Sequence, residues 1–430
     1  MKACILTLGC KVNAYESEFI KEQFKNNNYE IVELIDKPDV CVINTCTVTN
    51  QSDAKSRKMI RLARKTNPKS IIVVCGCAAE HHKDAIVDTD IDILIGNYYK
   101  SKIVSLVEQY KKDNKKINTF VDMKKQIFED MKINNFQNKT RAFVKIQDGC
   151  NNYCSYCIIP YMRGSIRSKD IDVAYEEIKC LVNNGYQEIV LTGIHTGSFG
   201  TGKNYDLVDL IKRISVLDNL KRIRISSIEI TELNDKFINE LKNNSKICNH
   251  LHVPIQSGSD HILKLMNRKY NIEEFKNIID KIRRVRPGIN LTTDLIVGFP
   301  EETDNDFLET VNNLKIIGFS KIHTFPYSIR DNTPASKMKQ VNDSIKKDRT
   351  NKILELSDEL ENNYYNKFIN KELDILIEEL KDNKSIGHTD NYIKIVIDDI
   401  LEHNKFYRVK ITKIINNNVY GVVIRNNKMY

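Results

Sequence analysis

Along most of the 430 residues, short apolar runs alternate with longer amphipathic stretches. In the first hundred residues the apolar runs are ACILTL, DVCVINTC, SIIVVCGC and IDILIG, and YESEFIKEQFKNN and SDAKSRKMIRLARKT lie between them. Continuous Val and Ile runs are typical of strands that are buried on both faces of a parallel sheet. The N-terminal part of this α/β chain is therefore predicted to form an open parallel α/β sheet domain.

The alternation resumes on a larger scale from about residue 140. Apolar segments RAFVKIQ, EIVLTGI, RIRISSI, HLHVPIQ, NLTTDLIVGF and KIHTFPY are separated by helical stretches such as VAYEEIKCLVNNG and IEEFKNIIDKIRRV. About six successive β/α units predict a full or partial (β/α) barrel. Its active site is expected at the carboxyl ends of the strands.

The C-terminal part has a different pattern. A charged helical segment, residues 343–369, precedes LDILIEELKD, YIKIVID, KFYRVKITKI and VYGVVIRN, which alternate apolar and polar residues. This pattern predicts a small antiparallel β-barrel, a fold that often binds single-stranded or looped nucleic acid. With the polar, Lys-rich stretch 111–126 as a boundary, the predicted domains are 1–125, 136–366 and 367–430.

The composition excludes some classes of protein. No run of eighteen apolar residues is present, which argues against a transmembrane helix, and MKACILTLGCKVN is typical of a first strand and not of a signal peptide. We therefore expect a cytoplasmic protein. The net charge of +9 is compatible with a nucleic-acid partner and equally with solvated Lys. RLARK (61–65) and KIRRVRP (281–287) are candidate phosphate contacts, and each is also typical of a solvated helix face.

Three of the eleven Cys residues form a close group in DGCNNYCSYCIIPYMRG, namely Cys150, Cys154 and Cys157. In a reducing compartment such spacing indicates metal chemistry and not disulfides. Structural zinc takes four protein ligands, and no fourth Cys or His lies near this motif. Three Cys on an iron–sulfur cluster would leave one iron free to bind a substrate or cofactor.

A second set of thiols is predicted from the strand pattern. Cys10, Cys46 and Cys77 each follow a predicted strand of the N-terminal domain, so one edge of the parallel sheet would present all three. Cys75, two residues before Cys77 on the same predicted strand, remains an alternative ligand. The other Cys are expected to behave as small hydrophobic residues. His81 and His82 are expected to be exposed to solvent.

The spacing of Cys150, Cys154 and Cys157, with Tyr156 before the last Cys, resembles the radical S-adenosylmethionine enzymes. The two three-Cys sets together resemble the methylthiotransferase family over essentially the whole chain. The motifs TLGCKVNAYESE, NTCTVTNQSDAKSR and TGIHTGSFG are most similar to the branch that acts on N6-threonylcarbamoyladenosine in tRNA. The resemblance implies a radical S-adenosylmethionine barrel, an auxiliary cluster in the first domain and a C-terminal TRAM domain that binds RNA.

The resemblance also implies the cofactors, partners and site residues. Two [4Fe-4S] clusters would be held by Cys150, Cys154 and Cys157 and by Cys10, Cys46 and Cys77. S-adenosylmethionine would lie against LTGIHTG (191–197), RISSIE (224–229) and DLIVGFPEET (294–303). The partners would be a tRNA anticodon loop and an electron donor such as a flavodoxin or a ferredoxin. The expected cofactor contacts are Tyr156, Thr192, Gly193, Ser226, Glu229, Gln256, Asp294 and Gly298.

Several assignments stay open at this stage. His195 either contacts substrate or packs, and Arg163 and Arg167 either hold the cofactor carboxylate or an RNA phosphate. The alternative functions are a methylthiotransferase that acts on isopentenyladenosine in tRNA or on an aspartate of a ribosomal protein, and a non-catalytic iron–sulfur protein that binds RNA or senses redox state. A structural zinc protein is a third class, and it would be colourless.

Overall fold

The N-terminal domain is a six-stranded parallel sheet with strand order β2-β1-β3-β4-β5-β6, as the continuous apolar runs predict. The computed structural model describes residues 1–82, 91–136 and 139–424. The elements of this domain are β1 (Lys2–Thr7), α1 (Lys11–Asn26), β2 (Glu30–Ile31), β3 (Val40–Thr45), α2 (Asn50–Thr66), β4 (Ile71–Gly76), α3 (Cys77–His81), β5 (Ile93–Ile95), α5 (Ile103–Asp113) and β6 (Ile117–Thr119).

The Lys-rich stretch 111–126, predicted to be only a boundary, contributes a strand to this sheet. Residues Ile117–Thr119 form β6, which pairs in parallel with β5. The strand is short and only partly buried, so it lacks the apolar run that marks the other strands.

The central domain is a partial (β/α) barrel. Six parallel strands form two three-stranded sheets, β7-β10-β11 and β12-β13-β14, and a parallel bridge from Ile223 to Ile247 lies between them. The strands are β7 (Arg141–Lys145), β10 (Glu188–Thr192), β11 (Arg222–Ile225), β12 (His250–His252), β13 (Asn290–Val297) and β14 (Lys321–Pro326), and a two-stranded ribbon is formed by β8 (Gln147–Asp148) and β9 (Arg167–Ser168).

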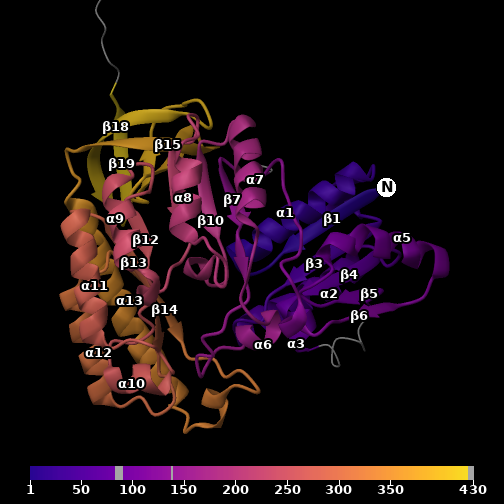
Figure 1. The fold of residues 1–430 in the computed structure, drawn as a ribbon, viewed down its shortest axis with the longest axis horizontal. Coiled ribbons are helices and arrows are strands. Elements are labelled where there is room, and N and C mark those ends of the chain that lie inside the picture. Colours follow the sequence, from indigo (N-terminus) through magenta and orange to yellow (C-terminus); the bar gives the residue numbers. More distant parts are fainter. Residues whose placement is uncertain (83–90, 137–138, 425–430) are drawn as a thin grey trace, which may run out of the picture.

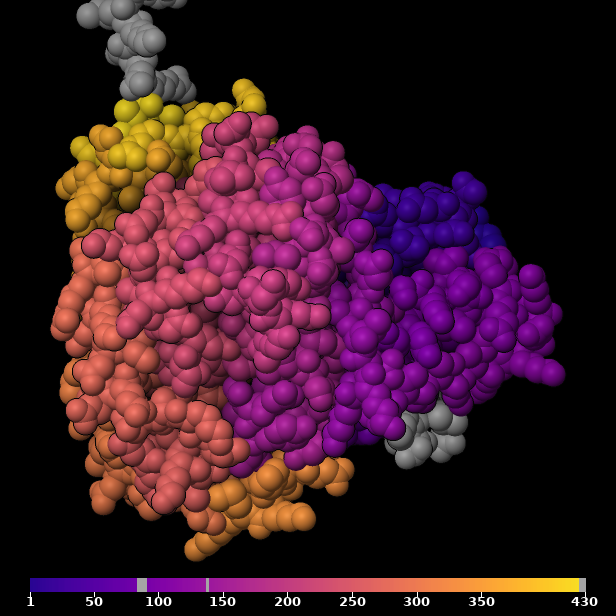
Figure 2. Space-filling view, viewed as in Figure 1, coloured from indigo at the N-terminus to yellow at the C-terminus, as the bar shows by residue number. Residues whose placement is uncertain are grey.

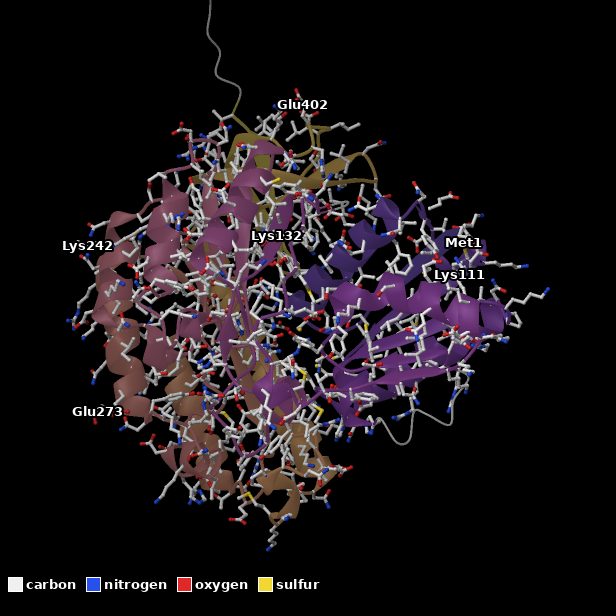
Figure 3. All side chains as sticks on the ribbon, turned by 45° about the vertical axis from the view of Figure 1, so that its right-hand side comes forward. Met1, Lys111, Lys132, Lys242, Glu273 and Glu402 are labelled. Carbon is white, nitrogen blue, oxygen red and sulfur yellow. The ribbon has the colours of Figure 1, made fainter. Side chains whose placement is uncertain are left out.

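Helices cover the outside of these strands (Figure 1). They begin where polar side chains cap the first turn: Asp170 accepts from two backbone amides of α7, and Asn271 and Thr303 form capping boxes on α11 and α12. Lys242 and Glu273 lie on the outer face of this helical layer (Figure 3). The helices are α7 (Ile171–Asn183), α8 (Leu207–Ser215), α9 (Asp235–Asn243), α10 (Asp260–Leu265), α11 (Ile272–Val285), α12 (Asp304–Ile317) and α13 (Asp343–Asn366). The short helix α6 (Ile159–Arg163) lies instead beside α3 of the N-terminal domain (Figure 1).

The C-terminal domain is a closed five-stranded barrel with strand order β15-β16-β17-β19-β18. Four of its pairings are antiparallel, as expected, whereas β17 and β19 pair in parallel. Its strands are β15 (Glu372–Lys381), β16 (Lys384–Thr389), β17 (Lys394–Ile397), β18 (Phe406–Ile415) and β19 (Asn418–Val423). It packs on one end of the central barrel, and the three domains form one continuous body (Figure 2). No helix among the described residues has the length and apolar character needed to cross a membrane.

A buried network of charges joins the first two domains. Glu16 of α1 pairs with Lys100 at 2.6 Å in its own domain and with Lys145 at 2.7 Å and Arg163 at 3.0 Å in the barrel. Asp148 continues the network through Lys145, Arg163 and Arg167. Arg163 and Arg167 are thus held by protein carboxylates, and their expected contact with a cofactor carboxylate or an RNA phosphate stays a prediction. Sequence spacing alone does not reveal these partners, which are distant in sequence.

Candidate functional site

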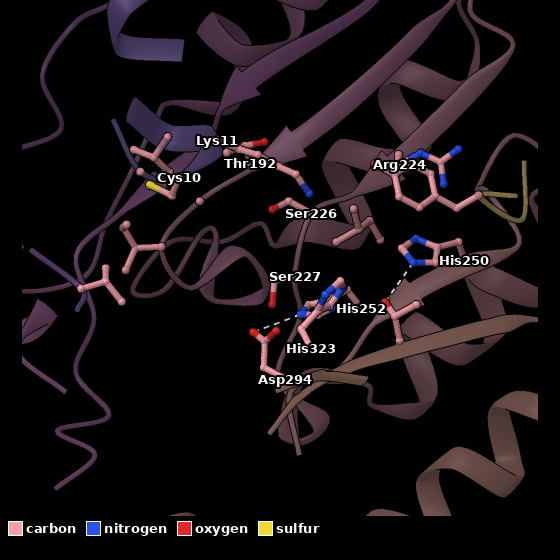
Figure 4. A pocket seen from close by; sticks show the side chains of 18 of the residues that line it. Cys10, Lys11, Thr192, Arg224, Ser226, Ser227, His250, His252, Asp294 and His323 are labelled. Carbon is pink, nitrogen blue, oxygen red and sulfur yellow. Dashed lines mark hydrogen bonds and ion pairs between the residues drawn. The ribbon is translucent and has the colours of Figure 1, made fainter. Parts of the chain in front are cut away.

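A cavity of about 740 Å³ lies where the three domains meet. One side is formed by the N-terminal sheet edge with Cys10, Cys46 and Cys77, and the other by the strand ends of the barrel. Tyr392 of the C-terminal barrel also lines it, so all three domains contribute. Figure 4 shows Cys10 on one side of this space and Ser226, His252 and Asp294 across from it. The volume is within the range of small-molecule and cofactor sites.

Gly9 and Gly76 allow the backbone turns that bring the N-terminal thiols close together. Gly9 adopts φ +93°, and a Cβ there would lie 2.7 Å from the Cβ of Cys46. Gly76 adopts φ +98°, and a Cβ there would lie 2.5 Å from the carbonyl oxygen of Thr45. These left-handed conformations are open to glycine and strained for other residues. The chain therefore turns sharply after β1 and β4 and brings Cys10 and Cys77 to Cys46.

Cys75 and Cys77 do not share a strand, contrary to the sequence-based expectation. Cys75 lies in β4 and is fully buried in the apolar core, whereas the turn at Gly76 makes Cys77 the first residue of α3. Burial raises the pKa of Cys75 to about 12. Cys77 instead lines the cavity, and its Sγ lies 3.6 Å from Nδ2 of Asn97.

The barrel cysteines form a second group, in the loop after β8. The backbone amide of Cys157 donates to the carbonyl of Cys154 at 2.9 Å, and Tyr153 between the first two Cys adopts φ +45°. Arg268 donates from Nη1 to Sγ of Cys154 at 3.2 Å. Cys154 also lines a second, small hollow beside Arg268, apart from the main cavity. Burial raises the pKa of Cys157 to about 12, so without a metal this thiol stays protonated at neutral pH.

In this structure neither thiol set is drawn together as closely as the ligands of a single metal ion. Within the described residues, neither set has its three sulfur atoms within 4.8 Å of one another. A tetrahedral zinc site with Zn–S distances of about 2.3 Å would hold its sulfurs closer than that.

The charge around the N-terminal thiols fits an anionic group. Arg163 is fully buried and interacts electrostatically with Cys10 and Cys77. In the ion-pair network to which it belongs, four cations meet two carboxylates, Glu16 and Asp148. A buried surplus of positive charge is costly unless negative charge balances it. Thiolates that hold an iron–sulfur cluster supply such charge.

The expected cofactor contacts fall into two groups. Thr192, Gly193, Ser226 and Asp294 line the cavity. The other four lie outside its lining among the described residues. Tyr156 packs near Phe299, with ring centroids 6.4 Å apart, and Glu229 pairs with Arg268. Gln256 adopts φ +64° and bonds to β13 through its backbone, and the amide of Gly298 donates to Glu302 at 2.6 Å.

His195 lies against the barrel thiols. Its Nε2 is 2.8 Å from a carboxylate oxygen of Glu232, and its backbone amide donates to Gln147 at 2.7 Å. Burial alone would lower the pKa of His195, but the neighbouring Cys150 and Glu232 raise it to about 10. The residue therefore packs between a candidate ligand and a carboxylate.

His81 and His82 are half-buried and not solvent-exposed as expected. His82 Nε2 lies 3.3 Å from Asp53, and His81 Nδ1 lies 3.2 Å from the hydroxyl of Thr47. These two His and Asp53 are close enough to hold one ion, but Arg330 already pairs with the same Asp53 oxygen at 2.6 Å. Because Arg330 belongs to the barrel, the group is a contact between domains.

Sequence reasoning missed a row of polar residues on the cavity floor. The hydroxyl of Thr292 lies 3.0 Å from His250 Nε2 and 2.9 Å from His252 Nδ1, and His252 Nε2 lies 3.2 Å from Asp294. Tyr392 stacks on His250, with ring centroids 4.9 Å apart. Burial lowers the pKa of His250 well below its usual range, so this ring is neutral. The alternation in HLHV places both His on one strand face and was a usable signal, whereas no signal pointed to Tyr392.

Residues 144–314 match the Radical SAM superfamily, and residues 2–96 match an uncharacterized protein family, UPF0004. The threonylcarbamoyladenosine tRNA methylthiotransferase of Bacillus subtilis is 43% identical, covering 95% of this chain and 93% of the relative. Its namesake in Aquifex aeolicus is 37% identical over 96% of this chain and 100% of the relative. The tRNA-2-methylthio-N(6)-dimethylallyladenosine synthase of Clostridium tetani is 34% identical over 97% and 95%.

The fold is similar to a solved structure of low sequence identity. The radical S-adenosylmethionine methyltransferase TsrM from Kitasatospora setae, with cobalamin and a [4Fe-4S] cluster bound, superposes with a TM-score of 0.59 at 12% identity. The match covers 78% of this chain and 76% of that one. At this identity the similarity supports the fold alone.

Proposed function

The chain belongs to the radical S-adenosylmethionine methylthiotransferase family, and from this premise we propose that it converts N6-threonylcarbamoyladenosine beside the tRNA anticodon to its 2-methylthio derivative. The observation that carries the proposal is the cavity that joins Cys10, Cys46 and Cys77 to the strand ends of the barrel. The 43% identity to the Bacillus subtilis enzyme favours this substrate over isopentenyladenosine, for which the relatives are 34% identical.

The family uses S-adenosylmethionine and [4Fe-4S] clusters, which supply the radical chemistry that turns an aromatic C–H into C–S–CH3. Cys150, Cys154 and Cys157 would hold the cluster that leaves one iron open, and Cys10, Cys46 and Cys77 the auxiliary one. Each set has a neighbouring cation that can balance thiolate charge, Arg268 beside Cys154 and Arg163 beside the N-terminal thiols.

The chain's own residues would bind and orient the reactants. Thr192, Gly193 and Ser226 offer hydroxyl and backbone groups at the strand ends, where S-adenosylmethionine is expected. Tyr156, Glu229, Gln256 and Gly298 are not among the residues that line the cavity, and their roles as cofactor contacts stay predictions. Residues of all three domains line the cavity, and groups that limit the access of water to a site protect reactive intermediates there.

The proposed boundaries, 1–125, 136–366 and 367–430, assign one domain to each wall. The proposed partners are the tRNA anticodon loop and a small reduced electron carrier such as a flavodoxin or a ferredoxin. A cytoplasmic location is proposed because tRNA and such carriers are found there.

The decisive experiment is mass spectrometry of tRNA nucleosides from cells that lack the gene, complemented by the wild-type chain. We expect 2-methylthio-N6-threonylcarbamoyladenosine to disappear on deletion and to return on complementation. Loss of the methylthio-isopentenyladenosine signal instead would contradict the proposed substrate and keep the family. No change in either nucleoside would contradict a tRNA substrate.

A basic stripe on α2 is proposed to contact the tRNA backbone. Arg57, Arg61 and Lys65 recur every four residues on the exposed face of α2, whose Asp53 is buried. Arg64 does not belong to this stripe, since it pairs with Asp92 at 2.7 Å. In the other candidate stretch, 281–287, Arg283 and Arg286 donate to backbone carbonyls and are structural.

Replacing both Arg57 and Arg61 by Glu is expected to raise the KM for tRNA by about tenfold or more and to flatten its dependence on salt, because a protein that neutralises fewer phosphates displaces fewer counterions from the RNA. The measurement is steady-state methylthiolation at several salt concentrations. The double change of Lys281 and Arg284 to Glu on α11, both exposed, is the matched control with the same change in charge and should leave the KM unchanged. Equal effects of both changes would mean that only net charge matters.

A further inference from the structure

Lys11 is a cation that faces the cavity without a partner. It is the first residue of α1, and its side chain extends between Cys10 and the part of the cavity formed by Arg224 and His250 (Figure 4). Among the described residues, no hydrogen bond or ion pair of its ammonium group is found, and its high solvent exposure is exposure to the cavity itself. A cation in such a place is a candidate for contact with a bound anion.

The positive charge of Lys11 is not balanced by the charged groups around it. Its electrostatic neighbours are Tyr392, Arg141, Arg224 and Asp294. Arg224 already pairs with Glu188 at 2.7 Å, and Arg141 pairs with Glu378 at 3.0 Å. Asp294, the one carboxylate of the four, pairs with His252.

This unbalanced positive charge makes the part of the cavity around Lys11 suited to one small anion. The guanidinium groups of Arg141 and Arg224 act electrostatically on Lys11 and disfavour an additional cation there. Tyr392 also lines the cavity, and its ring centroid lies 4.6 Å from the guanidinium carbon of Arg224. A carboxylate bound to Lys11 would complete the charge balance, and an apolar group there would cover the ammonium and leave it without a partner.

We propose that Lys11 binds the carboxylate of the threonylcarbamoyl group and so selects the modified adenine that is the substrate; the inference rests on the proposed function. The isopentenyl group of the alternative substrate is uncharged and cannot pair with Lys11. A site built to pair with a polar group rejects analogues that lack it more strongly than an apolar site rejects an extra methylene.

The position of Lys11 also suits the geometry of the base. Carbons 2 and 6 of adenine both flank nitrogen 1, so the N6 substituent and the carbon to be modified lie on the same edge of the ring. Lys11 directly follows Cys10, one of the three N-terminal thiols. A substituent held by Lys11 therefore brings carbon 2 to the thiol side of the cavity.

The test compares two anticodon stem-loops, one with threonylcarbamoyladenosine and one in which a carboxamide replaces the carboxylate. The wild-type holoenzyme is expected to prefer the carboxylate by about 100-fold in kcat/KM. In Lys11→Met this preference should fall to near unity through loss on the carboxylate substrate alone, and Lys11→Arg should restore most of it. Lys25→Met, at the other end of α1 and exposed, is the matched control and should keep the full preference.

Two further measurements distinguish a role of Lys11 in substrate binding from a role in maintaining the local structure. Iron content and the RNA-independent cleavage of S-adenosylmethionine should be unchanged in Lys11→Met, which shows that the site around Cys10 is intact. Equal loss on both stem-loops would overturn the inference and assign Lys11 to a phosphate or to local structure. If the wild type turned over both stem-loops without preference, the inference about Lys11 would be overturned and the proposed function would stand. Absence of any turnover by an iron-replete wild type would overturn the proposed function together with it.

Discussion

Cys154→Ala is expected to abolish both the cleavage of S-adenosylmethionine and methylthiolation, whereas Cys46→Ala is expected to abolish methylthiolation and leave the cleavage measurable. The reason is positional. Cys154 belongs to the barrel loop and lines the small hollow beside Arg268, while Cys46 stands at the edge of the N-terminal sheet and lines the main cavity. Each set would lose one of three ligands, and a cluster held by two thiolates is not retained.

The measurements are anaerobic formation of 5′-deoxyadenosine, the yield of methylthio-nucleoside, and iron per chain after reconstitution. Each variant should lose iron equivalent to one cluster. Cys180→Ala is the control, because Cys180 lies on α7 with its Sγ 3.4 Å from Asn134, away from both thiol sets, and should keep all three values. If Cys46→Ala also lost the cleavage reaction, the two sets would not be independent and the assignment of roles would fail.

Arg163→Met is expected to lower the free energy of unfolding by about 3–5 kcal/mol, because it removes one partner of a buried charge network. Glu16 and Asp148 would each lose a cation while remaining fully buried. Arg163 also donates to Asn13 at 2.7 Å, and Asn13 in turn donates to the carbonyls of Leu8 and Thr45, next to the thiol-bearing turns. Loss of auxiliary iron should therefore accompany the loss of stability.

Thermal unfolding and iron content of the purified protein check this result. Arg213→Met is the matched control, since Arg213 pairs with Asp172 on the exposed surface, and a change of about 0–1 kcal/mol is expected there. A variant at Arg163 as stable as that control would show that the network contributes little.

The same network sets the response of the domain interface to acid. Burial alone would raise the pKa of Glu16, but Arg163, Lys100 and Lys145 outweigh it and hold the pKa far below the usual value. A carboxylate with a depressed pKa in the folded state contributes stability above its unfolded pKa, and that contribution is lost as the pH falls toward the folded value. The interface is thus stable at neutral pH and weakens only in strong acid.

Much of the fold followed from local pattern. The apolar runs predicted the parallel sheet, the β/α units predicted the partial barrel, and the alternating C-terminal strands predicted the small barrel. β6 was missed because a three-residue, half-exposed strand leaves no apolar run. The parallel pairing of β17 with β19 was missed because closure of a barrel joins strands by geometry and not by sequence order.

Local pattern placed Cys10, Cys46 and Cys77 at one edge of the sheet, and all three line the cavity, whereas contacts that depend on long-range packing were missed. The barrel set was chosen by spacing and the N-terminal set by position after strands, with Cys77 preferred over Cys75 by resemblance to the family. The ligand roles of all six thiols stay predictions. The partners of Arg163 come from both domains, and Tyr392 reaches the cavity from a turn at φ +64° in the third domain. No short motif encodes such contacts, since they arise only when the three domains are packed together.

The wall that carries Tyr392 has a consequence for how the enzyme matures. Protein synthesis proceeds from the N-terminus, so Cys10, Cys46 and Cys77 leave the ribosome well before the residues of the third domain that line the same cavity. Iron and sulfide delivered during translation can reach these three thiols before the third domain is present. A chain that acquires its auxiliary cluster only after release must take it up with the walls from all three domains already in place.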